Sequence, residues 1–133
     1  MKAVILTLCV LASACGGGSS SPTAPSATPQ PYNQTVTGTV SSLGIVQHPL
    51  SIPRSGNMTL TLSWGTTADL DLYLTNSSCN AYPPDSCQIL AASDGVAATE
   101  RITRTVTSGE SFKIWVDSFS FSPQNYTIAI SIQ

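Results

Sequence analysis

The stretch "ADLDLYLT", residues 68–75, decides the fold class, because its apolar and polar residues alternate. Its leucines (Leu70, Leu72 and Leu74) fall on one side of an extended chain, and its aspartates fall on the other. A period of two is the pattern of a β-strand that turns one face toward a core. The leucines are therefore expected in the core, and the aspartates on the outer face.

The same period recurs along the rest of the chain. It is clear in residues 57–64, 111–117 and 126–132, and weaker in 35–40, 45–52, 88–92 and 100–106. Turn sequences rich in Gly, Ser, Asn and Pro separate these runs, and none of the runs shows a sustained 3.6-residue apolar period. The pattern predicts an all-β fold, an antiparallel jelly-roll-like β-sandwich of about eight strands.

Four segments give this domain a family resemblance. They are "SGNMTLTLSW" (55–64), "ADLDLYL" (68–74), "SGESFKIWVD" (108–117) and "YTIAISI" (126–132). Together they resemble the bacterial pre-peptidase C-terminal (PPC) domain, over roughly residues 47–132. The resemblance implies a β-sandwich of the kind appended to secreted proteases and other exported proteins. In some proteins this domain is removed after secretion, and in others it binds collagen-type or other extracellular polymers.

The N-terminus reads as an export signal. "MKAVILTLCVLASAC" has one lysine and a short apolar run, too short to span a bilayer core. "LASAC" followed by Gly and Ser resembles the lipobox of bacterial lipoproteins, in which the cysteine, here Cys15, is lipidated and becomes the new N-terminus. The alternative is a secreted protein cut near Ala14, with Cys15 as a free thiol.

This interpretation divides the chain into three parts. Residues 1–14 are the lipoprotein signal peptide, 15–33 are the lipidated cysteine (carrying a fatty acid such as palmitate) and a Gly/Ser/Pro-rich linker, and 34–133 are the β-sandwich. The linker has almost no apolar surface and no charge, so it is expected to be a disordered tether. We expect a cell-envelope lipoprotein held on the membrane by its lipid. Gly16 favours the outer membrane if the source is Gram-negative.

Composition excludes one class of partner. Without Lys2, which leaves with the signal, four basic residues face seven acidic ones. Nucleic-acid binding needs a basic patch, and this chain offers none. The domain is expected to be a monomer.

Two cysteines remain in the domain, in "CNAYPPDSC" (79–87). In an exported protein, Cys79 and Cys87 are expected to form one disulfide that closes a local loop. A metal site would need more ligands than this loop supplies.

The sequence offers no catalytic machinery. The chain has a single histidine, His48, and no GxSxG, HExxH or glycine-rich phosphate loop. His48 shares the parity of Val46 and Leu50, so it is expected to face inward as a structural residue. The protein is therefore not expected to be an enzyme.

Aromatic residues on polar positions supply a candidate binding patch. Tyr73 and Trp115 fall on the polar parity of their strands. If those strands are neighbours, both rings would share a surface with Asp69, Asp71 and Asp117. The alternative is that a loop such as residues 118–124 folds over the rings.

Calcium is the one candidate cofactor, with Asp69 and Asp71 as candidate ligands, because it prefers hard oxygen ligands. Some domains that resemble this one bind calcium through acidic loop residues. The alternative is a solvated strand face whose charges discourage edge pairing.

The function expected from these features is a non-enzymatic, lipid-anchored module of the cell envelope. It would bind or adhere to an extracellular polymer, a glycan or a protein. The alternative is a structural accessory domain that assists an exported protease or another secreted enzyme.

Overall fold

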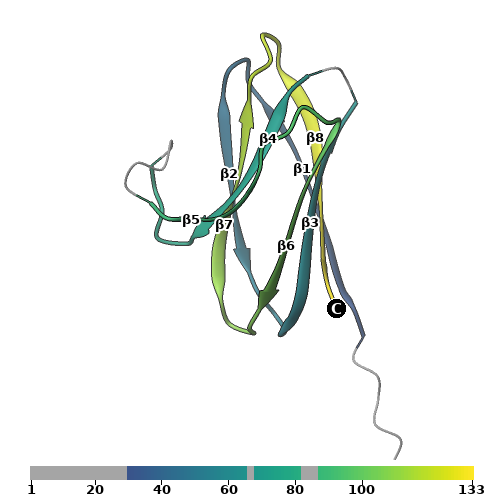
Figure 1. Cartoon of the computed structure of the whole chain (residues 1–133), viewed down its shortest axis with the longest axis vertical. Coiled ribbons are helices and arrows are strands. Elements are labelled where there is room, and N and C mark those ends of the chain that lie inside the picture. The colour runs from purple at the N-terminus through teal and green to yellow at the C-terminus, as the bar shows by residue number, and fades with distance from the viewer. Residues whose placement is uncertain (1–29, 66–67, 82–86) are drawn as a thin grey trace, which may run out of the picture.

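The computed structural model describes residues 30–65, 68–81 and 87–133, and it is a sandwich of two antiparallel sheets (Figure 1). The first sheet has the strand order β1-β8-β3-β6, and the second has the order β2-β7-β4-β5. The strands are β1 Tyr32–Val40, β2 Ile45–Ser51, β3 Gly56–Trp64, β4 Leu70–Asn76, β5 Ile89–Ser93, β6 Thr99–Val106, β7 Ser111–Ser118 and β8 Gln124–Ile132. The expected all-β sandwich is thus confirmed.

The alternating residues fill the space between the sheets. Leu70, Leu72 and Leu74 of β4 are fully buried, as the alternation predicts. They join inward residues of the other strands in one core cluster, which includes Met58, Leu60, Leu62, Ile114, Val116, Ile128, Ile130 and Ile132. Burial of each of these side chains stabilises the folded state by about 1.5–3 kcal/mol.

Two polar residues have the inward parity of β6, Glu100 and Arg104. Glu100 is buried, and Arg104, which breaks the alternation between Ile102 and Val106, is half-buried. Its guanidinium carbon lies 5.8 Å from the centre of the Phe112 ring, so the cation stacks on an aromatic face at the margin of the core.

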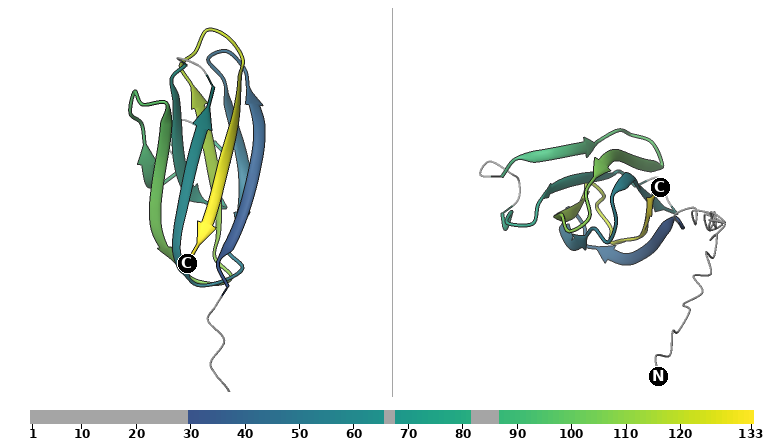
Figure 2. Two further views of the ribbon diagram at one scale, coloured as in Figure 1. Left: turned by 90° about the vertical axis from the view of Figure 1, so that its right-hand side faces the viewer. Right: turned by 90° about the horizontal axis from the view of Figure 1, so that it is seen from below.

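The chain enters and leaves the sandwich at the same end. β1 begins at Tyr32 and pairs with the C-terminal β8, so the start of β1 and the C-terminus lie together there (Figures 1 and 2). Tyr32 and Asn33, which composition assigns to the linker, already belong to this strand. The signal peptide, Cys15 and most of the linker lie outside the described residues. Across the described ranges, no helix is long and apolar enough to cross a membrane.

Two of the turns at the opposite end of the sandwich, which we call the far end, are joined to each other. The turn between β1 and β2 carries the chain from the first sheet to the second, and the turn between β7 and β8 carries it back. A hydrogen bond from the Leu43 amide to the Ser120 carbonyl (2.9 Å) joins these turns. Leu43 has a positive φ of 49°, unusual for a side chain of this size.

Candidate binding surfaces

The structure brings the predicted patch residues together on the outer face of the second sheet. β4 and β7 are neighbours, and their register pairs Tyr73 with Trp115 and Asp71 with Asp117. Asp69 lies just before β4, and its carbonyl accepts a hydrogen bond from the Phe119 amide (3.0 Å). The predicted patch requires that the two strands be neighbours, and they are.

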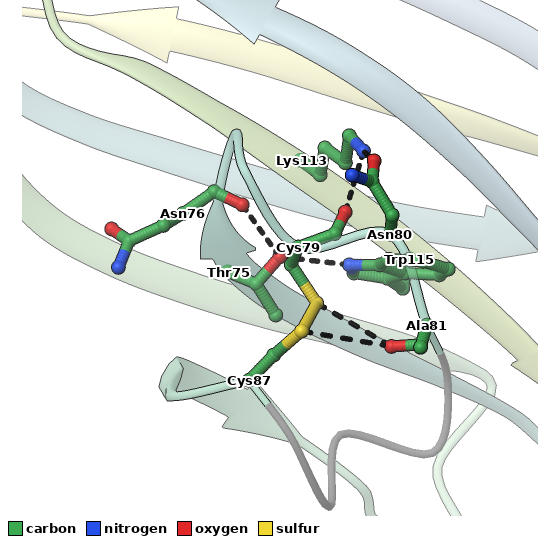
Figure 3. Close-up of a disulfide and its surroundings, with 8 residues drawn as sticks. All are labelled: Thr75, Asn76, Cys79, Asn80, Ala81, Cys87, Lys113 and Trp115. Atoms are coloured by element: carbon green, nitrogen blue, oxygen red, sulfur yellow. Dashed lines mark hydrogen bonds between the residues drawn. A yellow bond between two sulfur atoms is a disulfide. The ribbon is translucent and has the colours of Figure 1, made fainter.

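Trp115 is nevertheless buried, with 5% of its surface exposed. Its indole Nε1 donates to the hydroxyl of Thr75, at 2.9 Å, and Thr75 is itself only 1% exposed. The chain around Cys79 passes beside the ring (Figure 3), and Lys113 holds it there by donating to the Cys79 carbonyl and to Oδ1 of Asn80. Trp115 is thus not part of an exposed platform, which agrees with the alternative of a ring covered by another part of the chain.

The predicted disulfide is confirmed. Cys79 and Cys87 are bonded, with Cα atoms 5.5 Å apart, and Cys79 is buried against the outer face of the second sheet. A disulfide indicates an exported protein, because cytosolic thiols are kept reduced. A cavity of about 190 Å³ adjoins it, lined by Asn76, Ser78, Cys79, Cys87 and Gln88.

The aspartate pair is only partly solvated. Asp71 is 6% exposed, and Tyr73 donates its hydroxyl to Oδ2 of Asp71 at 2.8 Å. Burial raises the pKa of Asp71; the Tyr73 hydrogen bond opposes this, while Asp69, Asp94 and Asp117 raise the pKa further. Oδ1 of Asp69 is buried without a hydrogen-bond partner. Within the described ranges, no three His, Cys, Asp or Glu side chains are grouped to hold a metal ion, and calcium at Asp69 and Asp71 stays a prediction.

The outer face of the first sheet has a different character, because hydroxyl and amide side chains cover it. Pairing across β1, β8, β3 and β6 aligns its outward residues in rows. The rows are Thr39-Asn125, then Thr37-Thr127-Ser63-Thr99, then Thr35-Ala129-Thr61-Arg101, then Asn33-Ser131-Thr59-Thr103, and last Asn57-Thr105. Arg101 is the single charge in these rows. No described segment lies over this face (Figure 2, left).

This face is hollowed near the far end of the sandwich. A cavity of about 510 Å³ is lined by Thr37, Gly38, Thr39, Ser63, Trp64, Gly65, Asn125, Tyr126 and Thr127. We call it the threonine cleft. It lies where β3 ends and opens to solvent, since Thr37, Thr39 and Asn125 are exposed.

Trp64 forms part of the wall of the threonine cleft. Its side chain is half-buried against the core, which agrees with its inward parity. The indole Nε1 donates to the carbonyl of Ala68, at 2.7 Å, so the ring is tied to the chain that leads into β4. Alternation alone gave no reason to select Trp64, because an inward tryptophan reads as core.

A third surface lies at the far end. Leu43, Ile45, Phe119 and Phe121 are exposed there by 58%, 40%, 52% and 87%. The hydrogen bond between Leu43 and Ser120 keeps the two turns together, and Gln124 braces the second turn through bonds to Ser120 and Ser122. We call these four residues the apolar tip. Tyr82, a further loop aromatic, lies outside the described residues.

No protein-family model and no curated protein matches the chain. Solved structures with a similar fold are found. The mitogen derived from Yersinia pseudotuberculosis is 20% identical, with a TM-score of 0.57 over 78% of this chain and 88% of that one. The pre-peptidase C-terminal domain of a collagenase from Bacillus anthracis is 11% identical, with a TM-score of 0.57 over 74% and 88%.

A periplasmic inhibitor of g-type lysozyme, PliG from Aeromonas hydrophila, is also similar: 14% identical, with a TM-score of 0.55 over 76% of this chain and 86% of that one. At these identities the likeness shows the fold alone. The chain therefore has the fold of a PPC domain, as the sequence motifs predict.

Proposed function

We propose that this protein is a non-enzymatic, lipid-anchored module of the cell envelope that binds an extracellular polymer. The observation that carries the proposal is the outer face of the first sheet, which is open, nearly uncharged and covered by hydroxyl and amide groups. Such groups donate and accept hydrogen bonds with any polar polymer laid across them. The rows run over four strands, so the face suits an extended ligand better than a small one.

The position of the N-terminus is compatible with this role. The strands run from the end where β1 begins to the far end, so the hydroxyl-covered face lies along the side of the domain (Figure 2). A lipid on Cys15 would hold the opposite end of the linker at the membrane. The face would then be accessible to a polymer beside the domain.

Co-sedimentation tests the proposal. The chain from Gly16 to Gln133, which contains all eight strands, is mixed with insoluble cellulose, chitin or cross-linked gelatin. Binding to at least one polymer is expected, with bovine albumin as the control protein. Each assay is run with calcium and with chelator, because Asp69 and Asp71 are candidate ligands. If the chain sediments with none of these polymers, either with calcium or with chelator, the result would count against the proposal.

Metabolic labelling with a fatty-acid analogue tests the anchor. We expect label on the wild-type chain and none on Cys15→Ser. Label that persists on Cys15→Ser would show that Cys15 is not the lipidated residue, and an unlabelled wild-type chain would favour the secreted form cut near Ala14.

The apolar tip favours the second candidate function, an accessory domain that assists an exported protease or another secreted enzyme. Exposed apolar side chains that gather at one place mark interaction sites for other proteins. Replacing Leu43, Phe119 and Phe121 with serine should lower the secreted proteolytic activity of cells that produce the protein. Unchanged activity, with the variant present at normal level, would speak against this function.

A further inference from the structure

We infer that the threonine cleft is a binding site for an uncharged saccharide segment. This inference rests on the proposed function and deepens it, because it names both the site and the chemical class of the polymer. Two properties of the cleft carry it: the hydrogen-bonding groups of its wall and the absence of charge among its lining residues.

The wall of the cleft offers groups that match sugar hydroxyls. Thr37, Thr127 and Ser63 stand side by side in one row across three strands, because the register pairs Thr127 with both of the others. A hydroxyl side chain both donates and accepts, as a sugar hydroxyl does. Neighbouring strands lie about 4.8 Å apart, so successive hydroxyls of the row can reach different oxygens of the same saccharide.

Asn125 adds a donor of a second kind. The Thr39 hydroxyl donates to Oδ1 of Asn125, at 2.6 Å. This contact fixes the amide orientation, and the Asn125 nitrogen carries two further hydrogens for a ligand. Thr39 and Asn125 form the row next to Thr37 and Thr127, so the amide continues the same polar wall.

Charge decides between classes of saccharide. None of the residues that line the cleft is charged. A carboxylate or sulfate group drawn into it would lose water without gaining a cation, which is costly. The domain as a whole has more acidic than basic residues, which further disfavours an anionic polymer. The cleft is thus suited to a neutral glycan.

Trp64 lines the cleft, but its ring is turned inward: it packs against the core and donates to the Ala68 carbonyl. The hydroxyls of Ser63 and Thr127 lie on the opposite, outward parity. The hydrogen-bonding groups of the wall therefore carry the recognition, and Trp64 serves as a nearby reporter.

Tryptophan fluorescence gives a readout next to this cleft. The chain has two tryptophans, Trp64, which lines the cleft, and Trp115, which is buried on the outer face of the other sheet. In Trp115→Phe, emission comes from Trp64 alone. This variant is titrated with neutral dextran, galactomannan and laminarin, with anionic polygalacturonate and alginate, and with soluble gelatin. We expect a saturable change in emission with at least one neutral glycan.

Paired threonine variants then locate the ligand. Thr37→Val with Thr127→Val removes two hydroxyls while keeping shape and β-branching. We expect affinity for the neutral glycan to fall about tenfold or more, because each lost hydrogen bond contributes roughly 0.5–1.5 kcal/mol and 1.4 kcal/mol is tenfold. Thr103→Val, an exposed threonine of the same face outside the cleft, is the matched control and should bind as wild type. Circular dichroism and melting curves confirm that each variant is folded.

The outcomes separate the inference from the proposed function. A neutral glycan that binds equally well to Thr37→Val/Thr127→Val would overturn the cleft as the site and leave polymer binding standing. Binding confined to the anionic glycans or to gelatin would overturn the saccharide class. If the domain binds no soluble or insoluble polymer, the proposed function fails together with the inference.

Discussion

The Nε2 atom of His48 lies 2.7 Å from the hydroxyl oxygen of Tyr126, and this contact joins the two sheets along the side formed by β1 and β2. His48 belongs to the edge strand of the second sheet, and Tyr126 belongs to β8 of the first. Their rings meet edge to face, with centroids 5.9 Å apart. Burial lowers the pKa of His48 and raises the pKa of Tyr126, so both side chains are held in their neutral forms.

This pair predicts a loss of stability in mild acid. Because the folded-state pKa of His48 is below its ordinary value of 6.5, the unfolded chain binds a proton more readily. The free energy of unfolding should therefore fall as pH drops through 6.5 toward the folded pKa. Urea denaturation at pH 7.5 and at pH 5.5 measures the fall. His48→Gln should flatten it, since the chain has no other histidine, and an unchanged fall in that variant would refute the assignment.

Gly38 is predicted to be intolerant of a side chain. A Cβ there would lie 2.5 Å from the Tyr126 hydroxyl oxygen and 2.7 Å from its Cζ, so the Tyr126 ring would have to move. Overpacking of this kind costs about 1–3 kcal/mol, and Gly38→Ala should lower the free energy of unfolding by that amount. Gly65→Ala is the matched control, because no atom lies within 4 Å of the Cβ it would add. Equal stability of the two variants would contradict the crowding of Tyr126.

The disulfide is predicted to stabilise the domain and to keep Trp115 covered. Replacing Cys79 and Cys87 with serine frees the loop in the unfolded chain, which should lower the free energy of unfolding by about 2.5 kcal/mol. In a Trp64→Phe background, where only Trp115 emits, the change should also shift emission to longer wavelength. A loss of stability without a shift would mean that the strands and the Lys113 contacts cover Trp115 without help from the disulfide.

Ionised Asp71 is predicted to destabilise the fold. Its folded-state pKa is above the ordinary 3.8, mainly through burial, so the free energy of unfolding should fall as pH rises from about 3.8 through the folded pKa. Asp71→Asn removes the charge, and its amide oxygen can still accept the Tyr73 hydroxyl. We expect the variant to melt higher than wild type at pH 7, with a smaller difference at pH 4.

The control for charge is Asp94→Asn, at an exposed position. If both variants gain equally in melting temperature, the gain comes from a general relief of repulsion between acidic residues. It would then not reflect a cost of burying the Asp71 charge. If calcium binds at Asp69 and Asp71, adding it should raise the melting temperature of wild type, and Asp71→Asn should reduce that rise.

Alternation of apolar and polar residues was enough to predict the strands and the core, because each strand buries one face and a period of two records which face that is. It placed Leu72 and Ile128 in the core and His48 inward, and the structure agrees. It failed at Trp115, whose polar position predicted exposure. The chain around Cys79, which is held by a disulfide and by Lys113, passes beside the ring, and no local pattern encodes that contact.

Alternation along the chain predicts an all-β sandwich and most of the side chains that fill it, since both follow from the period of each strand. Which strands are neighbours is known only from the folded molecule. The pairing sets Thr37, Thr127 and Ser63 in one row, although these residues come from three strands far apart in the chain. Hydrogen bonding between strands fixes such rows. The residues of a surface built from several strands can therefore be identified only when the pairing register of the strands is known.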